Sequence, residues 1–227
     1  MEAAHPRTAL EGVEHHDQHL VSDAARWSKR CFDILAASIL LVLLVPLLVI
    51  VALAVKLHDG GPVLFRQARM GRGGRPFRIA KFRTMVPDAE TRLRANPELY
   101  ARYVGNDFKL DLCDDVRVSG LGRFLRASSL DELPQLFNVL RGDMSLVGPR
   151  PIVQPELAQY AERGAATAYL ADRPGLTGLW QVSGRNRLGY DERIHLDLVY
   201  VSSRSLAIDL KILLRTPLAV LRRDGVH

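Results

Sequence analysis

The sequence contains little cysteine and none of the common nucleotide- or metal-binding motifs. Its two cysteines, Cys31 and Cys113, are too few for a disulfide framework, which favours a reducing compartment. We find no internal repeat, no Walker A or GxGxxG motif, and no Cys/His spacing typical of a zinc site. These absences argue against a disulfide-stabilised scaffold, a repeat protein and the most frequent nucleotide- and zinc-binding proteins.

The composition is that of a folded, basic protein. The chain has 227 residues, of which 25% are charged and 48% hydrophobic. This fits one domain with room for a tail and an appended segment. The formal net charge of +6 at pH 7 predicts anionic partners: phosphates, nucleic acid or an acidic lipid surface.

Residues 1–25 are polar and contain four of the seven histidines: His5, His15, His16 and His19. A metal-binding tract would need further ligands at a matching spacing, and no later segment supplies them. We therefore expect a disordered, solvated tail over residues 1–25.

A long apolar run follows the tail. Ile34 to Val55 are 22 residues without a charge. As a helix they would extend about 33 Å, against a hydrocarbon core of about 30 Å. A signal peptide has a shorter apolar region and a cleavage site of small residues after it. We therefore predict a membrane-embedded segment over residues 26–58.

Two topologies are compatible with this segment. Lys29 and Arg30 precede it, and Lys56 and Arg66 are the first of several basic residues that follow. The positive-inside rule therefore places both ends on the cytoplasmic side. A bend at Pro46 would allow this, because proline removes a backbone hydrogen bond and displaces a carbonyl. A kinked single span is the alternative, and these residues do not separate the two.

Two short strands are predicted after the apolar run. Segments 60–67 and 76–85 hold brief apolar stretches around a Gly-rich turn, which suggests a hairpin. Its basic residues are interpreted as a solvated face, a headgroup patch or a phosphate site. The headgroup interpretation suits the arginines nearest the apolar run. Lys81 and Arg83 are the better phosphate candidates.

Two adjacent carboxylates, Asp131 and Glu132, stand where a helix is expected to begin. With Ser129 as N-cap, Glu132 would close a capping box. With Asp131 as N-cap, Pro134 would fall where its missing N–H costs nothing, and we slightly prefer this register. In either register both acids lie at the positive end of a helix dipole, which favours their ionised form. Capping without chemistry is the commoner role of such residues.

The rest of the chain alternates helices with loops rich in Gly and Pro, which predicts an α+β fold that is mostly helical with short strands. Arg150 lies between two prolines that fix its backbone, which suits bidentate binding of a planar or phosphate group, although a surface turn is commoner. The other expected elements are a surface helix over 87–103 with breaks at Pro87 and Pro97, an amphipathic helix ending near Arg126, an inward face of Leu133, Leu136, Phe137 and Leu140, a strand over 144–147, a helix over 152–171, loop and strand over 173–185, a helix over 191–200 with His195 on its surface, and an amphipathic helix over 208–223 that rests on the membrane.

Five blocks in one order resemble the bacterial sugar transferase family, the monotopic polyprenyl-phosphate phosphoglycosyl transferases. Together they are far more specific than any single block, and the resemblance extends from about Lys29 to Arg215. The blocks are GPVLFRQ (61–67), PFRIAKFRTM (76–85), SLDELPQLFNVLRGDMSLVGPRP (129–151), RPGLTGLWQVSGR (173–185) and DLKILLRT (209–216).

The resemblance implies a monotopic protein of the bacterial inner membrane, with a re-entrant helix broken at Pro46 and both its ends in the cytoplasm. Residues 59–227 would form the cytoplasmic catalytic domain at the membrane interface. Many relatives carry extra N-terminal membrane helices, so this chain is expected to be a minimal catalytic unit. Two departures from the family pattern are Val45, where Ser is common, and Val116, where Pro is usual.

The resemblance also implies a reaction. Asp131 would attack the sugar-bearing phosphorus of a UDP-sugar, releasing UMP and leaving an aspartyl phosphosugar, and undecaprenyl (polyprenyl) phosphate would then accept the group. Asp131 and Glu132 would bind Mg²⁺, with Glu132 acting through the metal or in proton transfer. This would be an initiating step of exopolysaccharide, O-antigen or glycoprotein glycan assembly. The expected substrate-binding residues are Lys81, Arg83, Arg126, Pro149, Arg150, Pro151 and Arg185.

The expected partners are a UDP-sugar, polyprenyl phosphate and membrane lipids, and no nucleic acid. A homo-oligomer and downstream glycosyltransferases stay open as further partners. The main alternative function is a membrane-tethered anion-binding module in which Asp131 and Glu132 only cap a helix. An inactive scaffold and a hydrolase are weaker alternatives, because the acid, Pro-Arg-Pro and basic motifs are intact and a hydrolase would not need the membrane segment.

Overall fold

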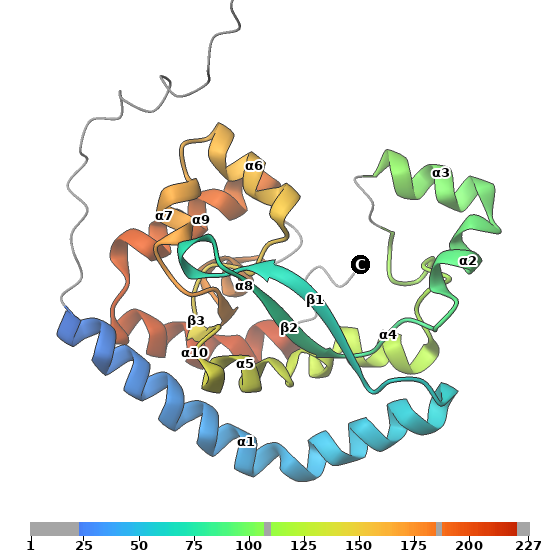
Figure 1. The fold of residues 1–227 in the computed structure, drawn as a ribbon, viewed down its shortest axis with the longest axis horizontal. Helices are drawn as coiled ribbons and strands as arrows, with labels where there is room; N and C mark the ends of the chain where they lie inside the picture. Colours follow the sequence, from blue (N-terminus) through green and yellow to red (C-terminus); the bar gives the residue numbers. More distant parts are fainter. Residues whose placement is uncertain (1–22, 107–109, 185–187, 222–227) are drawn as a thin grey trace, which may run out of the picture.

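The computed structural model describes residues 23–106, 110–184 and 188–221 (Figure 1). Its longest element is helix α1 (Asp23–Asp59), which contains Pro46. In Figure 1 α1 runs beneath the other elements and bends near its middle, as expected where proline removes a helical hydrogen bond. The helix begins at Asp23 rather than at residue 26, and residues 1–22 of the expected tail lie outside the described residues.

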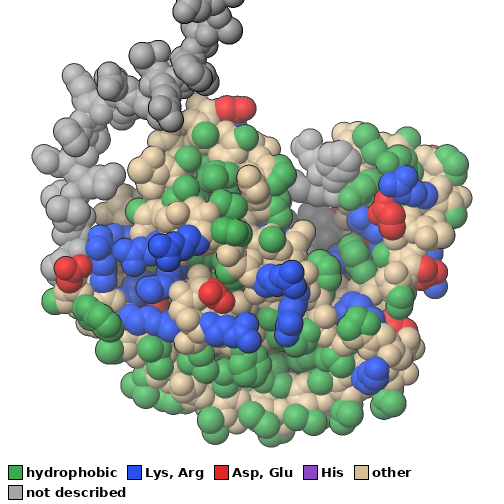
Figure 2. Space-filling view, in the orientation of Figure 1, with side chains coloured by type: hydrophobic (Ala, Val, Ile, Leu, Met, Phe, Trp, Pro, Cys, Tyr) green, Lys and Arg blue, Asp and Glu red, His purple; other side chains and the backbone are tan. Residues whose placement is uncertain are grey.

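Most of the apolar surface of α1 is exposed, as the hydrophobic lower edge of the molecule in Figure 2 shows. Val42, Leu43 and Ile50 are 73%, 70% and 64% exposed. Among the described residues α1 is the one helix long and apolar enough to cross a membrane. An exposed apolar surface of this size is unfavourable in water, which indicates membrane association.

The predicted strands form an antiparallel hairpin above α1. It consists of β1 (Leu64–Met70), the 3-10 turn η1 (Arg72–Gly74) and β2 (Pro76–Phe82). The register pairs Phe65 with Lys81 and Arg69 with Phe77. Directly opposed residues share a face of the ribbon and side chains alternate along each strand, so Lys81 and Arg69 lie on the same face.

The next segment is helical with the predicted proline breaks. Helices α2 (Ala89–Arg94) and α3 (Pro97–Gly105) project to the right in Figure 1. The Asn96 side chain caps α3 by accepting a hydrogen bond from the Leu99 N–H. Helix α4 (Gly120–Ala127) follows and leads to the acid pair.

A short parallel pair of strands carries the loop that contains Arg150. It consists of β3 (Ser145–Val147) and β4 (Gly175–Thr177), and β3 confirms the predicted strand. A Cβ atom on Gly175 would lie 2.1 Å from the backbone nitrogen of Gly148, so only glycine fits at this close approach. The backbone contact fixes where the loop after β3 begins.

The remaining helices surround these strands. They are α5 (Gln135–Arg141), α6 (Gln154–Glu162), α7 (Ala166–Leu170), α8 (Leu179–Ser183), α9 (Tyr190–Ser203) and α10 (Leu206–Leu221). The single helix expected over 152–171 is wrong: α6 and α7 are separated at Gly164, whose φ of 65° is left-handed. Segment 173–185 contains α8 in addition to the predicted strand.

The core joins α5 and β3 to α1. Leu136, Val139 and Leu146 pack in one cluster with Ala37 and Leu41 of α1. Burying this face against α1 stabilises both elements, because each removes apolar surface from water. The predicted inward face of α5 is right for Leu136, whereas Phe137 is 51% exposed, so its inward assignment is wrong.

Candidate active site

The acid pair lies on a strained turn between two helices. Ser129 has φ 56° and ψ 16°, the one left-handed non-glycine residue among those described. It opens the 3-10 turn η2 (Leu130–Glu132), which carries both acids, and α5 begins after Pro134. Backbone strain of this kind costs about 1–3 kcal/mol and is retained mainly at functional sites.

Neither predicted helix register is correct. Neither Ser129 nor Asp131 caps α5 with its side chain, and the N-cap position belongs to Pro134. The left-handed Ser129 interrupts the path from α4, so the acids sit on their own turn before α5. They lie near the N-terminal end of α5 as expected, but they are held by the turn and not by capping bonds.

Asp131 is a buried carboxyl group in a basic surrounding. It is 8% exposed. Burial, with a further contribution from the negative charge of Glu132, raises the pKa of the Asp131 carboxyl to about 6, while Lys81 and Arg126 offset part of the rise. At pH 7 and above this carboxyl is mainly ionised, poorly hydrated and close to cations, which suits a nucleophile.

Lys81 reaches the acid pair from the hairpin. Its ammonium nitrogen lies 2.6 Å from Oε1 of Glu132, and the two side chains are 23% and 31% exposed. The contact ties β2 to η2 and holds a positive charge beside both acids. Lys81 therefore lies beside the acid pair, and its role in substrate binding stays a prediction.

The two arginines predicted near the acids have different surroundings. Arg126, at the end of α4, donates from Nε to the Thr84 hydroxyl at 2.9 Å and lies close enough to Asp131 to lower its pKa. Arg83 forms an ion pair with Asp59 at the end of α1. That pair connects the membrane helix to the hairpin, and a role of Arg83 in substrate binding stays a prediction.

The backbone of Pro149, Arg150 and Pro151 is held from three sides. The Pro149 carbonyl accepts from the Gly175 N–H at 2.8 Å, and the Pro151 carbonyl accepts from Arg69 at 3.1 Å. The Arg150 carbonyl accepts from the Tyr169 hydroxyl at 2.7 Å. Each carbonyl of the Pro-Arg-Pro loop therefore has a partner, which fixes the direction in which the arginine leaves the backbone.

Arg150 stacks near an indole ring. Its Cζ atom lies 5.1 Å from the Trp180 ring centroid, and the Cζ atom of Arg193 lies 5.2 Å from the same ring. Cation–π contacts of this length favour a fixed orientation of the guanidinium group. Trp180 lies on α8 and is 2% exposed, so the ring against which Arg150 stacks is held in place by the core.

Arg69 is the residue that the sequence assigned to the wrong environment. The headgroup interpretation placed the first arginines of the hairpin at the membrane, whereas Arg69 turns inward to the Pro151 carbonyl. Burial and then the charge of Arg150 lower its pKa, and Glu132 acts in the opposite direction. Arg69 thus lies between the Pro-Arg-Pro loop and the acid pair. The sequence offered no local signal for this position, because the face that Arg69 shares with Lys81 depends on the register of the hairpin.

Several buried polar atoms of residues near the Arg150–Trp180 stack have no hydrogen-bond partner. Within the described chain they include Arg69 Nε, Trp180 Nε1, Gln181 Oε1, Tyr190 OH and Asp197 Oδ1. Native proteins leave few such atoms, and they concentrate where ligands or ordered water bind. Their presence beside Arg150 supports a polar ligand site at this loop.

The described residues contain no group of three or more His, Cys, Asp or Glu side chains that could hold a metal ion. Two neighbouring carboxylates are nevertheless enough for Mg²⁺, which is often bound by one or two carboxylates with substrate phosphates and water. The effect of Glu132 on the pKa of Asp131 shows the like-charge repulsion that a divalent cation would relieve. Arg185, the last predicted site residue, lies outside the described residues.

Comparison with known proteins gives the family. The family model described as bacterial sugar transferase matches residues 24–223. The undecaprenyl-phosphate galactose phosphotransferase of Salmonella typhimurium is 45% identical, over 92% of this chain and 44% of the relative. The exopolysaccharide production protein ExoY of Rhizobium meliloti is 46% identical over 88% of both chains. The UDP-glucose:undecaprenyl-phosphate glucose-1-phosphate transferase of Caulobacter vibrioides is 46% identical, over 88% of this chain and 72% of the relative.

The length of the relatives differs from that of this chain. This chain spans less than half of the length of the Salmonella relative and most of the length of the Rhizobium relative. The matched region contains α1, the hairpin, the acid pair and the Pro-Arg-Pro loop, which are the parts that build the site. The chain therefore belongs to the bacterial sugar transferase family.

Proposed function

We propose that this protein transfers a sugar 1-phosphate from a UDP-sugar to undecaprenyl phosphate, giving undecaprenyl-diphospho-sugar and UMP. The observation that carries the proposal is the convergence of Lys81 and Arg126 on the buried Asp131 at the strained turn. The names of the relatives, which include galactose and glucose phosphotransferases, support the same reaction class. The sugar donor is left open between these two.

The first step forms a covalent intermediate. An oxygen of the Asp131 carboxylate attacks the sugar-bearing phosphorus, and the bond from that phosphorus to the bridging oxygen breaks. UMP leaves with both electrons of that bond, and the sugar phosphate remains on Asp131 as an acyl phosphate. The raised pKa of Asp131 supports this role, because a more basic carboxylate is a better nucleophile once ionised.

The second step returns the enzyme to its first state. A phosphate oxygen of undecaprenyl phosphate attacks the same phosphorus, and the bond to Asp131 breaks, which regenerates the carboxylate. The acceptor is a lipid, so the site must be reached from the membrane. The apolar surface of α1 below the catalytic domain supports that requirement.

The chain's own cations have separate tasks in this scheme. Lys81 and Arg126 lie beside the reacting carboxylate and reduce the repulsion between two anions. Arg150, on the Pro-Arg-Pro loop, can bind phosphate oxygens of the uridine diphosphate bidentately, and Arg69 on β1 supports that loop through the Pro151 carbonyl.

Asp131 and Glu132 would hold Mg²⁺ in this scheme, because their like charges repel and both belong to one short turn. When bound, the ion would neutralise charge on the diphosphate. Glu132 also orients Lys81 through their 2.6 Å contact, whether or not a metal is present.

We further propose that α1 enters and leaves the cytoplasmic leaflet of the bacterial inner membrane by the same side. The bend at Pro46 and the basic residues at both ends support this topology over a straight span. The exposed apolar side chains of Phe124, Phe137 and Leu214 support membrane contact by α4, α5 and α10. The catalytic domain would then lie on the cytoplasmic surface.

Intact-mass spectrometry tests the transferase. Detergent-solubilised protein is mixed with Mg²⁺ and UDP-glucose or UDP-galactose without lipid acceptor, then quenched quickly because acyl phosphates hydrolyse. We expect a mass increase of one hexose phosphate in the wild type and none in Asp131→Asn. No adduct with either donor, and no UMP when undecaprenyl phosphate is added, would leave the anion-binding module as the better interpretation.

A further inference from the structure

A second basic region lies at the other end of α1 from the Asp59–Arg83 pair. A cavity of about 340 Å³ opens between the start of α1, the hairpin turn, the end of α9 and the start of α10. Figure 2 shows Lys and Arg side chains gathered on this side of the molecule. Six basic side chains line the cavity, Arg26, Lys29, Arg30, Arg72, Arg173 and Arg204, against two acidic ones, Asp33 and Asp172.

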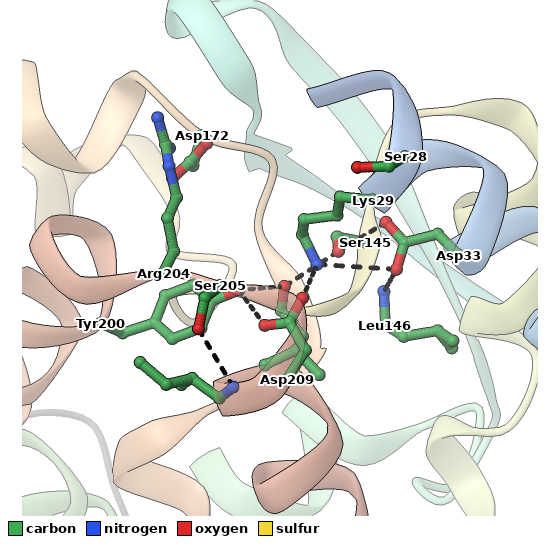
Figure 3. Close-up of polar contacts among 12 residues, drawn as sticks. Ser28, Lys29, Asp33, Ser145, Leu146, Asp172, Tyr200, Arg204, Ser205 and Asp209 are labelled. Carbon is green, nitrogen blue, oxygen red and sulfur yellow. Dashed lines mark hydrogen bonds and ion pairs between the residues drawn. The ribbon is translucent and has the colours of Figure 1, made fainter. Parts of the chain in front are cut away.

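Four of these cations are held by the protein itself. Lys29 binds Asp209, with Nζ 2.7 Å from Oδ2, and Arg204 pairs with Asp172, as Figure 3 shows. Arg30 donates to the Val139 and Leu140 carbonyls, and Arg173 donates to the Gly142 carbonyl, all at the end of α5. The last two therefore keep their positive charge without a carboxylate partner among the described residues.

The other two cations are not fixed by strong contacts. Arg72 makes no hydrogen bond or ion pair with any residue in the described part of the chain. With the described residues Arg26 forms one ion pair, at 3.6 Å with Asp23, whose side chain is 90% exposed, so this pair contributes little. Both side chains are available to a ligand in the cavity.

The charges in the cavity repel one another. Burial, followed by the charges of Arg30 and Arg72, lowers the pKa of Arg173. Burial, followed by the charges of Arg26 and Arg72, lowers the pKa of Arg204. A concave site with excess positive charge, arginine forks and little counter-charge is suited to a phosphate group.

We propose that this cavity is a binding site for a phosphate-bearing anion, separate from the acid pair. None of the residues placed in the active site lines it. Its α1 residues, 25 to 33, immediately precede the apolar run that starts at Ile34. If α1 is embedded as proposed above, the cavity opens at the depth of phospholipid headgroups, so an anionic phospholipid is the first ligand to test and free phosphate the second.

The test compares two double variants of the full chain in a neutral detergent. Arg26→Gln/Arg72→Gln removes the two loosely held cations of the cavity. Arg75→Gln/Arg78→Gln removes two exposed arginines of the same hairpin that do not line it. The two variants lose the same charge, so a general electrostatic effect would change both equally.

Calorimetry measures the Kd for two probes, dihexanoyl phosphatidylglycerol below its micelle concentration and inorganic phosphate. Dihexanoyl phosphatidylcholine provides the background from the acyl chains. We expect the cavity variant to bind at least one probe about tenfold more weakly than the wild type, and the control variant to stay within about twofold. Loss of the lipid probe alone identifies a headgroup site, loss of phosphate alone a soluble ligand, and loss of both a general phosphate site.

No binding of either probe to the wild type, or equal weakening in the two variants, would overturn the proposal. The readout is binding without turnover, so its failure can be told apart from failure of the transferase activity. Thermal unfolding of each variant checks folding, and neither Arg26 nor Arg72 makes a strong contact that its loss would break.

Discussion

Two pairs of carboxylates in this protein have opposite surroundings, Asp33 with Asp209 and Asp131 with Glu132. The carboxylates of Asp33 on α1 and Asp209 on α10 are saturated with hydrogen-bond donors. Asp33 accepts from the Ser145 hydroxyl at 2.8 Å and Asp209 from the Tyr200 hydroxyl at 2.7 Å. Lys29 lies between the two acids, 3.7 Å from Asp33 and 2.7 Å from Asp209 (Figure 3). This cluster joins the membrane helix to β3 and α10.

The acid pair at the other site is held far less tightly. Asp131 accepts no hydrogen bond from another described side chain, and Glu132 sits next to it with the same charge. Burial raises the pKa of both Asp131 and Asp33, but the second contribution differs: the negative charge of Glu132 adds to the rise at Asp131, whereas Lys29, the Ser145 hydroxyl and the Leu146 N–H offset part of it at Asp33. A buried carboxylate whose hydrogen bonds are all made stabilises the fold. A carboxylate with a raised pKa beside a ligand site can react.

The largest expected effect comes from removing the reactive carboxylate. Asp131→Asn should lower UMP release at least about 10³-fold, because the amide cannot form the proposed phosphosugar intermediate. Its melting temperature should stay close to that of the wild type, since no side-chain hydrogen bond is lost. Asp114→Asn, an exposed carboxylate paired with Arg102, is the control. Normal turnover by Asp131→Asn would rule out Asp131 as the nucleophile.

The saturated cluster should show the reverse pattern. Asp209→Ala removes the nearer carboxylate partner of Lys29, which keeps only Asp33 at 3.7 Å, and leaves the Tyr200 hydroxyl with the Val147 carbonyl alone. The loss of both contacts inside the fold should lower the free energy of unfolding by about 2–4 kcal/mol. Chemical denaturation in detergent measures it, and Asp209→Asn separates the lost charge from the lost acceptor. The folded fraction should keep its turnover within about threefold. A stable but inactive Asp209→Ala would contradict the division of roles.

An intermediate effect is expected at Lys81. Lys81→Met should slow transfer about 10- to 100-fold, since a positive charge beside the reacting phosphate is lost. The effect on stability should be small, because both partners of the pair are partly exposed. Arg66→Met, exposed on the opposite face of the same ribbon, is the matched control. Equal rates for the two variants would make Lys81 a structural residue only.

The smallest effect concerns another buried acid, Asp197 on α9. Burial raises its pKa to about 7, and the Tyr160 hydroxyl and Arg150 offset part of the rise. The folded state therefore holds this proton more tightly than the unfolded chain, so stability falls as pH rises from about 4 through 7. Asp197→Asn keeps an acceptor for Tyr160 and should flatten this dependence by about 1–2 kcal/mol. Melting temperatures between pH 5 and pH 8 test it, and an unchanged slope would exclude Asp197 as its source.

Local signals in the sequence predicted a large part of the fold. The charge-free residues from Ile34 onward indicated the long helix, and the Gly-rich turn indicated the hairpin. The prolines at 87 and 97 indicated the breaks around α2 and α3. The sequence and its family resemblance also proposed four site residues that the structure brings together, Asp131, Glu132, Lys81 and Arg126, and their roles stay predictions. The helix, the hairpin and the breaks depend on neighbours along the chain, so periodicity and turn chemistry suffice for them.

Features that depend on distant residues were not predicted. The contact of Lys29 with Asp209 joins residues 180 positions apart, and no local pattern indicates it. The inward turn of Arg69 follows from the register of the hairpin, which the sequence left open. The left-handed Ser129 overrode both capping registers, because tertiary packing can impose a backbone conformation that serine rarely adopts.

The long reach of α1 also has a consequence for how the protein is made. It precedes all other described elements along the chain, so the ribosome delivers the membrane segment first. The Asp59–Arg83 ion pair can form soon afterwards. Lys29 can pair with Asp209 only after the last described helix has been synthesised. The membrane helix is therefore synthesised before the catalytic domain, and the Lys29–Asp209 contact forms only when the last described helix packs against the first.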